Sequence, residues 1–186
     1  MSKITKYLLL ASFIGTAAES MIAPLYGMFV KDIGGGVLEA GLGAAIFSII
    51  TGLIIIASAN IKWFNANKEL VVFLGFTIAS FGDFAYFFVH NGFTLFMVQA
   101  TNGISVGLLN PAWEALYDKN MTEGEEHKSW SIWGAGANIA TGMAALFGAG
   151  IVHFFGFKTM FVCTAVVNSL AIYYSYLIYK QRNDKP

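Results

Sequence analysis

The sequence predicts an all-α protein, a polytopic membrane protein whose single domain (residues 1–186) is a bundle of six transmembrane helices. Composition and patterning both predict this class. Of all residues, 56% are hydrophobic and only 12% are charged, whereas about 25% of the residues of a soluble domain are charged. Long apolar runs recur from one end of the chain to the other, and a run of roughly 20 residues is enough to cross a bilayer as a helix.

Polar and glycine-rich breaks divide the apolar sequence into the predicted spans. The spans cover about residues 7–30, 37–59, 70–89, 93–116, 130–154 and 157–179. The clearest breaks are the glycine triplet at 34–36, the polar stretch 60–69, the turn at 90–92 and the charged loop 118–128. We expect these breaks to lie at the membrane surfaces, because irregular polar backbone is not tolerated in contact with lipid tails.

The basic residues fall almost entirely on one side of the predicted bundle. With six spans both termini share a side, which then carries nine of the eleven lysines and arginines. These nine are Lys3, Lys6, Lys62, Lys68, Lys119, Lys128, Lys180, Arg182 and Lys185, and the other side has only Lys31 and Lys158. Because cytoplasmic loops are enriched in Lys and Arg, we expect a multi-pass protein of the cytoplasmic (inner) membrane with both termini cytoplasmic.

Two further patterns concern the surfaces of the predicted helices. Eight aromatic residues fall near the expected cytoplasmic ends and are interpreted as an interfacial aromatic belt; they are Trp63, Trp113, Trp130, Trp133, Tyr173, Tyr174, Tyr176 and Tyr179. Gly134, Asn138 and Gly142 follow one another at intervals of four in the fifth span. Small residues at this spacing predict a face where helices pack closely.

Several other function classes lack support in the sequence. The net charge of zero offers no basic field for nucleic acid, so the expected partner is the lipid bilayer. No phosphate-binding loop, nucleophile elbow, zinc spacing or dinucleotide fingerprint is present. His127 and its acidic neighbours lack a fixed ligand spacing and are interpreted as a solvated loop. We therefore expect neither an enzyme nor a bound cofactor or metal.

Glu19 is the most informative single residue, because it falls near the middle of the first span. A carboxylate at that depth costs a few kcal/mol or more on insertion and is rarely left facing lipid. Ser12, Thr16 and Tyr26 extend a polar stripe along the same helix at helical spacing. We expect Glu19 to face a wet cavity and to interact with a proton or a cationic solute, although interhelical hydrogen bonding alone is the alternative.

The fourth span carries a polar ribbon. Gln99 and Asn110 are eleven residues apart and so lie on one face, with Asn102 between them and Glu114 one turn beyond Asn110. Asn102 is expected close in depth to Glu19. Polar groups at lipid depth need partners, so the ribbon either lines a cavity that handles a polar solute or a proton, or holds the bundle together.

Asp83 in the third span is the second acidic candidate. His90 follows seven residues later on the same face, which makes an Asp–His proton pathway conceivable and a packing or mouth-facing pair the alternative. Asn138 and Asn168 are single amides in apolar helices and are interpreted as packing contacts.

Three stretches resemble one six-helix half of the major facilitator superfamily. They run from Pro24 to Gly34, from Gln99 to Ala112 and from Phe154 to Phe161, and resemble its first helix exit, its fourth helix and its turn into the sixth helix. The resemblance implies a secondary transporter whose first and fourth helices line a central cavity. Glu19, Gln99, Asn102 and Tyr26 would then shape that cavity, with Asp83 and Asn110 as further candidates.

The sequence departs from the family pattern at three points. The loop 60–68 has lysines but lacks the acidic residue of the usual gating motif, Gln99 stands where a coupling arginine is common, and the fifth span has no proline. The length matches one half of a member that normally has two parallel halves. We therefore expect a half-size unit that pairs as a homodimer or with a second six-helix chain; a truncated gene is a further alternative.

Together these patterns predict a protein that moves a small solute by alternating access, as a dimer of half-size units. The alternative is a non-transporting membrane scaffold or a partner subunit of a larger membrane complex, which the altered gating loop favours.

Overall fold

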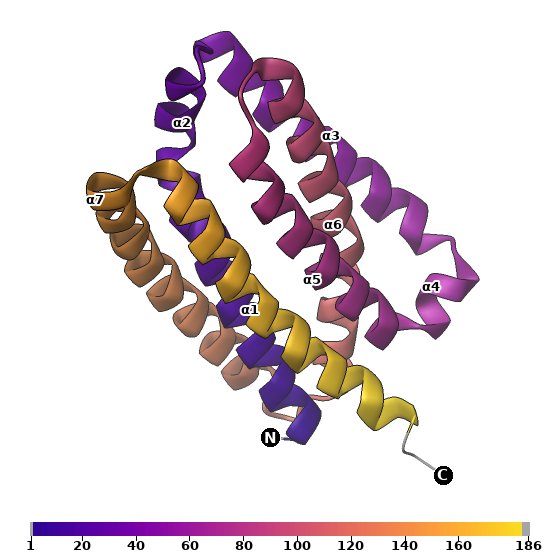
Figure 1. Ribbon diagram of the computed structural model, residues 1–186. Helices are drawn as coiled ribbons and strands as arrows, with labels where there is room; N and C mark the ends of the chain where they lie inside the picture. Colours follow the sequence, from indigo (N-terminus) through magenta and orange to yellow (C-terminus); the bar gives the residue numbers. More distant parts are fainter. Residues whose placement is uncertain (1, 184–186) are drawn as a thin grey trace.

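The computed structural model describes residues 2–183, and these residues form a bundle of long helices with no strands (Figure 1). The elements are α1 (Lys3–Ile22), η1 (Ala23–Leu25), α2 (Tyr26–Asp32), α3 (Val37–Ala59), α4 (Lys62–Ala66), α5 (Lys68–Ala85), η2 (Tyr86–Phe88), α6 (Gly92–Lys119) and α7 (Glu126–Asn183). The predicted all-α fold class is confirmed. Lys185, which was counted in the charge pattern, lies outside the described residues.

Local sequence explains where several helices begin and bend. Ser2 caps α1 by accepting the Thr5 N–H at 3.0 Å, and Asn91 caps α6 by accepting the Thr94 N–H at 2.9 Å. Each cap satisfies one of the backbone donors left free in the first helical turn. Pro24 lies in the short 3₁₀ turn that joins α1 to α2, so the two helices form one run through the bundle.

Gly156 divides α7, which is too long for a single crossing. Its 58 residues contain one non-helical position, where Gly156 has φ +80° and ψ 172°. This region of backbone space is essentially restricted to glycine. Segments 126–155 and 157–183 therefore run in opposite directions, as Figure 1 shows. Counted this way, the described chain contains six long helical runs.

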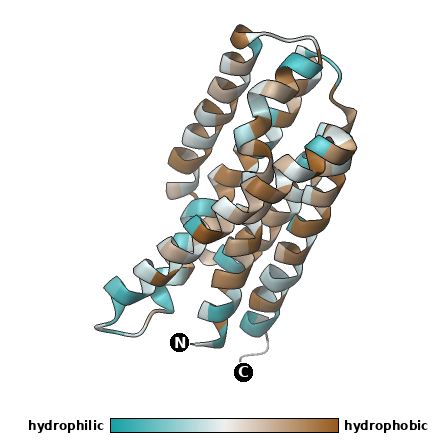
Figure 2. Cartoon of the chain, turned by 90° about the vertical axis from the view of Figure 1, so that its left-hand side faces the viewer, coloured by the Kyte–Doolittle hydropathy of each residue, from teal (hydrophilic) through white to brown (hydrophobic). Residues whose placement is uncertain are grey.

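The helices pack in a definite lateral order. α3 packs on α6, α6 on α5, α5 on α7, and α7 on α1. At one end, the Thr5 hydroxyl donates to the Asn120 carbonyl at 2.8 Å, and Arg182 donates to Glu69 at 3.4 Å. Both ends of the described chain lie at this end of the bundle, as Figure 1 shows, and we call it the terminal end. Figure 2 shows hydrophobic residues along the helices and hydrophilic residues gathered toward their ends.

A polar layer separates two apolar clusters inside the bundle. The cluster nearer the terminal end includes Leu8, Phe76, Leu109, Trp113 and Tyr117. The cluster nearer the opposite end includes Met21, Phe29, Tyr86, Leu95 and Phe161. Between them in chain position lie Glu19 on α1, Asp83 on α5, Asn102 on α6 and Asn168 on α7. Asn102 and Glu19 thus lie at similar depth.

Two of the tryptophans do not form the predicted belt. The Trp113 side chain is only 5% exposed, and its Nε1–H donates to the Leu8 carbonyl at 3.0 Å. The Trp133 Nε1–H donates to the Ser12 hydroxyl at 2.9 Å. The belt interpretation is wrong for these two residues because their indole N–H groups find partners on α1 instead of at a lipid headgroup. Trp63, by contrast, is 55% exposed.

The glycines that bring α1 and α7 together are not the ones that the spacing indicated. Gly136 faces Phe13, and Gly148 faces the backbone of Met21. Gly134 and Gly142 have no atom within 4 Å of the position that a Cβ would take. The face formed by Gly134, Asn138 and Gly142, which we call the α7 small-residue face, therefore packs against no other helix of the described unit.

Candidate functional site

Glu19 lies where two cavities meet. One cavity, of about 150 Å³, has Ser12, Glu114 and Trp133 in its wall and is called the proximal cavity because these residues lie toward the terminal end. The other, of about 350 Å³, has Tyr26 and Gln99 in its wall and is called the distal cavity. Glu19 and Ala79 line both. Glu19 is accessible within this unit and does not lie locked against a neighbouring helix.

The structure gathers the candidate residues into these two cavities. Five of the six line the distal cavity, and the sixth, Asn110, lines the proximal cavity together with Glu19. The five are Glu19, Tyr26, Asp83, Gln99 and Asn102. They come from α1, α2, α5 and α6, so residues far apart in the sequence meet in one place.

Two glycines make room for polar side chains in the distal cavity. Gly43 on α3 faces the Tyr26 hydroxyl, and Gly82 on α5 faces the Asn102 amide oxygen; a side chain at either glycine would collide with these atoms. Within residues 2–183, neither the Tyr26 hydroxyl nor the Asn102 Oδ1 has a hydrogen-bond partner. Buried polar atoms are normally paired, so this cavity presents unused hydrogen-bonding capacity.

Asp83 has a different partner from the one considered in the sequence. Its Oδ2 accepts a hydrogen bond from the Asn168 Nδ2 at 2.8 Å, and both side chains are buried. His90 is exposed, with its Nδ1 2.9 Å from the Phe88 carbonyl oxygen. The structure thus joins α5 to the second segment of α7 through a carboxylate–amide pair instead of an Asp–His pair.

Sequence reasoning missed the place of Asn168 in the site. The residue lines the proximal cavity, is only 1% exposed and, among the described residues, has no partner for its Oδ1. Its depth was the available signal, because Asn168 falls near the middle of the sixth span, as Glu19 does in the first. Trp133 and Glu114 of the proximal cavity are also absent from the site residues that the sequence predicts.

The two cavities are acidic and lack basic side chains. Glu19, Glu114 and Asp83 are their ionisable carboxyl residues, and no Lys, Arg or His among the described residues lines either cavity. In the part of the chain that the structure describes, the ion pairs join Lys128 to Glu125 and Arg182 to Glu69. Neither pair involves a cavity carboxylate, so a cation or proton is the natural counter-charge at mid-depth.

Comparison with models of known families decides the relationship. The model described as Major Facilitator Superfamily matches residues 8–186. The chain belongs to the Major Facilitator Superfamily. No curated protein gives a significant match. The resemblance noted in the sequence is confirmed, and the protein is an integral, multi-pass membrane transporter of this superfamily.

The altered loop of this superfamily member takes a defined structure. Residues 62–66 form α4, and Glu69, the first acidic residue after the loop, lies in the first turn of α5. The Arg182 guanidinium donates to Glu69 at 3.4 Å and to the Asn67 side chain at 3.2 Å. The loop is therefore tied to the end of α7 without the acidic residue that the family motif usually supplies.

Proposed function

We propose that this six-helix unit moves a small solute across the membrane by alternating access, with Glu19 interacting with the solute or with a proton. The observation that carries the proposal is the position of Glu19 in the wall shared by two cavities. Because α1 runs from the terminal end to the opposite end, one cavity lies on each side of Glu19 along the bundle. A carboxylate in this position can meet a ligand that arrives from either end.

The surroundings of Glu19 support a role in transport over a role in packing. Its carboxylate forms no ion pair among the described residues, whereas an acidic group that only fixed the bundle would be expected to have a partner. Gln99, Asn102, Tyr26 and Asp83 shape the distal cavity around the same point. Their amide, hydroxyl and carboxyl groups suit a polar solute.

We propose further that the unit works with a second six-helix unit, and that a second copy of this chain is the favoured partner. Much of α3 is exposed, including Leu38 at 70%, Ile49 at 61% and Ile56 at 69%. The α7 small-residue face is also open, and such faces allow close helix packing in membranes. Two copies with the same orientation in the membrane can be related by a two-fold axis along the membrane normal. The two parallel halves of members of this superfamily are related by an axis of the same kind.

Flux in reconstituted vesicles tests the transport proposal. Vesicles would be exposed in turn to radiolabelled small amines, sugars and organic anions, and a trapped pH-sensitive dye would report any coupled movement of protons. Wild-type protein should give flux of at least one solute above protein-free vesicles, and Glu19→Gln should lower it about tenfold or more, since hydrogen bonds to charged groups contribute about 1.5–3 kcal/mol. Glu123→Gln, in the exposed loop, is the matched control. Full flux with Glu19→Gln would contradict the role of Glu19.

Mass in mild detergent tests the pairing. Wild-type protein should show two copies of the 20.2 kDa chain, and Gly142→Leu should shift it toward one copy by obstructing the α7 small-residue face. A strict monomer that gives no flux would favour the alternative, a non-transporting scaffold or a subunit that needs a different partner.

A further inference from the structure

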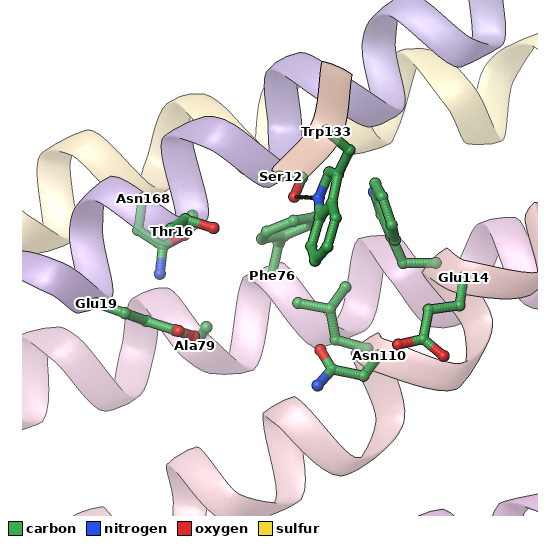
Figure 3. A pocket seen from close by; sticks show the side chains of 12 residues that line it. Ser12, Thr16, Glu19, Phe76, Ala79, Asn110, Glu114, Trp133 and Asn168 are labelled. Atoms are coloured by element: carbon green, nitrogen blue, oxygen red, sulfur yellow. Dashed lines mark hydrogen bonds between the residues drawn. The ribbon is translucent and has the colours of Figure 1, made fainter. Parts of the chain in front are cut away.

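Hydrogen-bond acceptors gather at one end of the proximal cavity. Thr16 and Glu19 are three residues apart on one face of α1, and Asn168 reaches the same cavity from the second segment of α7. Figure 3 shows these three side chains at one end of the cavity and Glu114 at the other. The three offer a hydroxyl, a carboxylate and an amide oxygen within one small space.

The Asn168 amide oxygen is the acceptor that most directly indicates a ligand. The side chain is 1% exposed, and its Nδ2 is already used in the 2.8 Å bond to Asp83. Its Oδ1 has no partner within residues 2–183. A buried carbonyl oxygen is normally satisfied. Because this oxygen is enclosed in the bundle, a donor from outside the chain would complete its hydrogen bonding when the cavity wall opens beside it.

The middle of the cavity is apolar and aromatic. Phe76 and Leu109 line it together with Trp113 and Trp133. The Trp133 ring is held in place by its 2.9 Å hydrogen bond to Ser12, which Figure 3 shows as a dashed line. A ring fixed in this way gives an apolar surface for the body of a ligand, and aromatic rings also attract cations.

The charges around the cavity favour a cation over other ligand classes. An anion would meet Glu19 and Glu114 without any basic side chain to bind it. A neutral solute would need a proton on each carboxylate as the counter-charge, whereas an organic cation supplies that charge itself. Mg²⁺ or Ca²⁺ needs about six oxygen ligands, and the described residues contain no group of three or more His, Cys, Asp or Glu that could hold a metal ion. Glu114 adds a second negative charge that favours entry of a cation.

We infer that the proximal cavity binds a small primary organic ammonium ion. Its three N–H donors bond to Glu19, to the Asn168 Oδ1 and to Thr16, because an –NH₃⁺ group has three donors and no acceptor. Its apolar body lies along Phe76 and Trp133. The cavity of about 150 Å³ is smaller than the 300–1,000 Å³ of drug-sized sites, which favours a small amine. This inference rests on the proposed function and specifies the class of its solute.

Three matched probes test the inference on wild-type protein purified in detergent, with protein-free micelles as the blank. The probes are phenethylammonium, its N,N,N-trimethyl derivative, which keeps the charge but has no N–H donor, and 2-phenylethanol, which has a similar body without a charge. Calorimetric titration should show phenethylammonium binding about tenfold or more tightly than either of the others. Equal or tighter binding of either other probe would overturn the inference.

Two substitutions locate the binding. Glu19→Gln should weaken phenethylammonium binding about tenfold or more, and Glu123→Gln, in the exposed loop, should leave it unchanged. Unchanged binding with Glu19→Gln would overturn the inference. Because binding in detergent requires no flux, protein that binds the ammonium probe but transports nothing would contradict only the proposed function. Flux of a neutral solute without ammonium binding would contradict only the inference.

Discussion

A pair of glycines on α7 gives the sharpest test of how the bundle is packed. A Cβ added at Gly148 would lie 2.6 Å from the carbonyl oxygen of Met21 and 2.9 Å from its Cα, whereas one added at Gly142 would meet no atom within 4 Å. Both substitutions to alanine gain helix propensity equally. Their difference therefore isolates the collision, which involves backbone and requires α1 and α7 to move apart. Overpacking of this kind costs about 1–3 kcal/mol.

Reversible unfolding by SDS, followed by circular dichroism, measures that difference. Gly142→Ala should leave the free energy of unfolding unchanged or raise it slightly. The free energy of unfolding of Gly148→Ala should be about 1–3 kcal/mol lower than that of Gly142→Ala. If the two variants unfold at the same SDS fraction, α1 and α7 do not approach each other as the structure shows. The position of Glu19 between the cavities would then lose its basis, because Glu19 and Met21 lie on the same helix.

Three further substitutions test other parts of the structure. Asn168→Leu should lower the free energy of unfolding by about 1–3 kcal/mol in the same SDS assay, because it leaves the buried Asp83 carboxylate without its partner. Gly156→Ala should cost about 1–3 kcal/mol, since φ +80° with ψ 172° excludes a Cβ without strain. Ala79→Leu should reduce flux, because Ala79 lines both cavities and a larger side chain would fill their junction.

Matched controls accompany two of these predictions. Asn65→Leu removes an exposed amide on α4 whose Nδ2 donates, among the described residues, to the Ala59 and Ile61 carbonyls, so unfolding should change by less than about 0.5 kcal/mol. Ala57→Leu adds the same volume at an exposed position of α3 and should leave flux intact. A loss of stability with Asn65→Leu as large as with Asn168→Leu would show that the Asp83 contact is not the cause. Normal flux with Ala79→Leu would show that the junction does not control passage.

The fold and the main polar residues were accessible from sequence because the bilayer restricts where polar groups can go. Only helices satisfy their own backbone hydrogen bonds in lipid, so apolar length alone indicated the runs. Glu19, Gln99 and Asn102 were identified because a polar residue at mid-depth has few tolerated positions other than the interior of the bundle. The structure places all three on the wall of the distal cavity.

Which helices are neighbours in the bundle could not be predicted from the sequence in the same way. Hydropathy gives depth but not which helices are neighbours, so nothing in the spacing joined Asp83 to Asn168 across α5 and α7. From the sequence, Trp133 near a helix end was compatible with a position at the lipid interface or inside the bundle. Its hydrogen bond to Ser12 decides for the inside of the bundle. The α7 glycines show the same limit, because Gly134 and Gly148 are equally small and only one faces α1.

The contrast between the two mid-depth acids separates packing from function. Asp83 is buried and accepts a hydrogen bond from Asn168, so it joins two helices and can be explained by assembly alone. Glu19 lies at a similar depth, is accessible from both cavities and, among the described residues, makes no ion pair. A carboxylate that served only to hold helices together would be the one with the partner. Its unpaired state at the junction is therefore better explained by a ligand or proton that comes and goes.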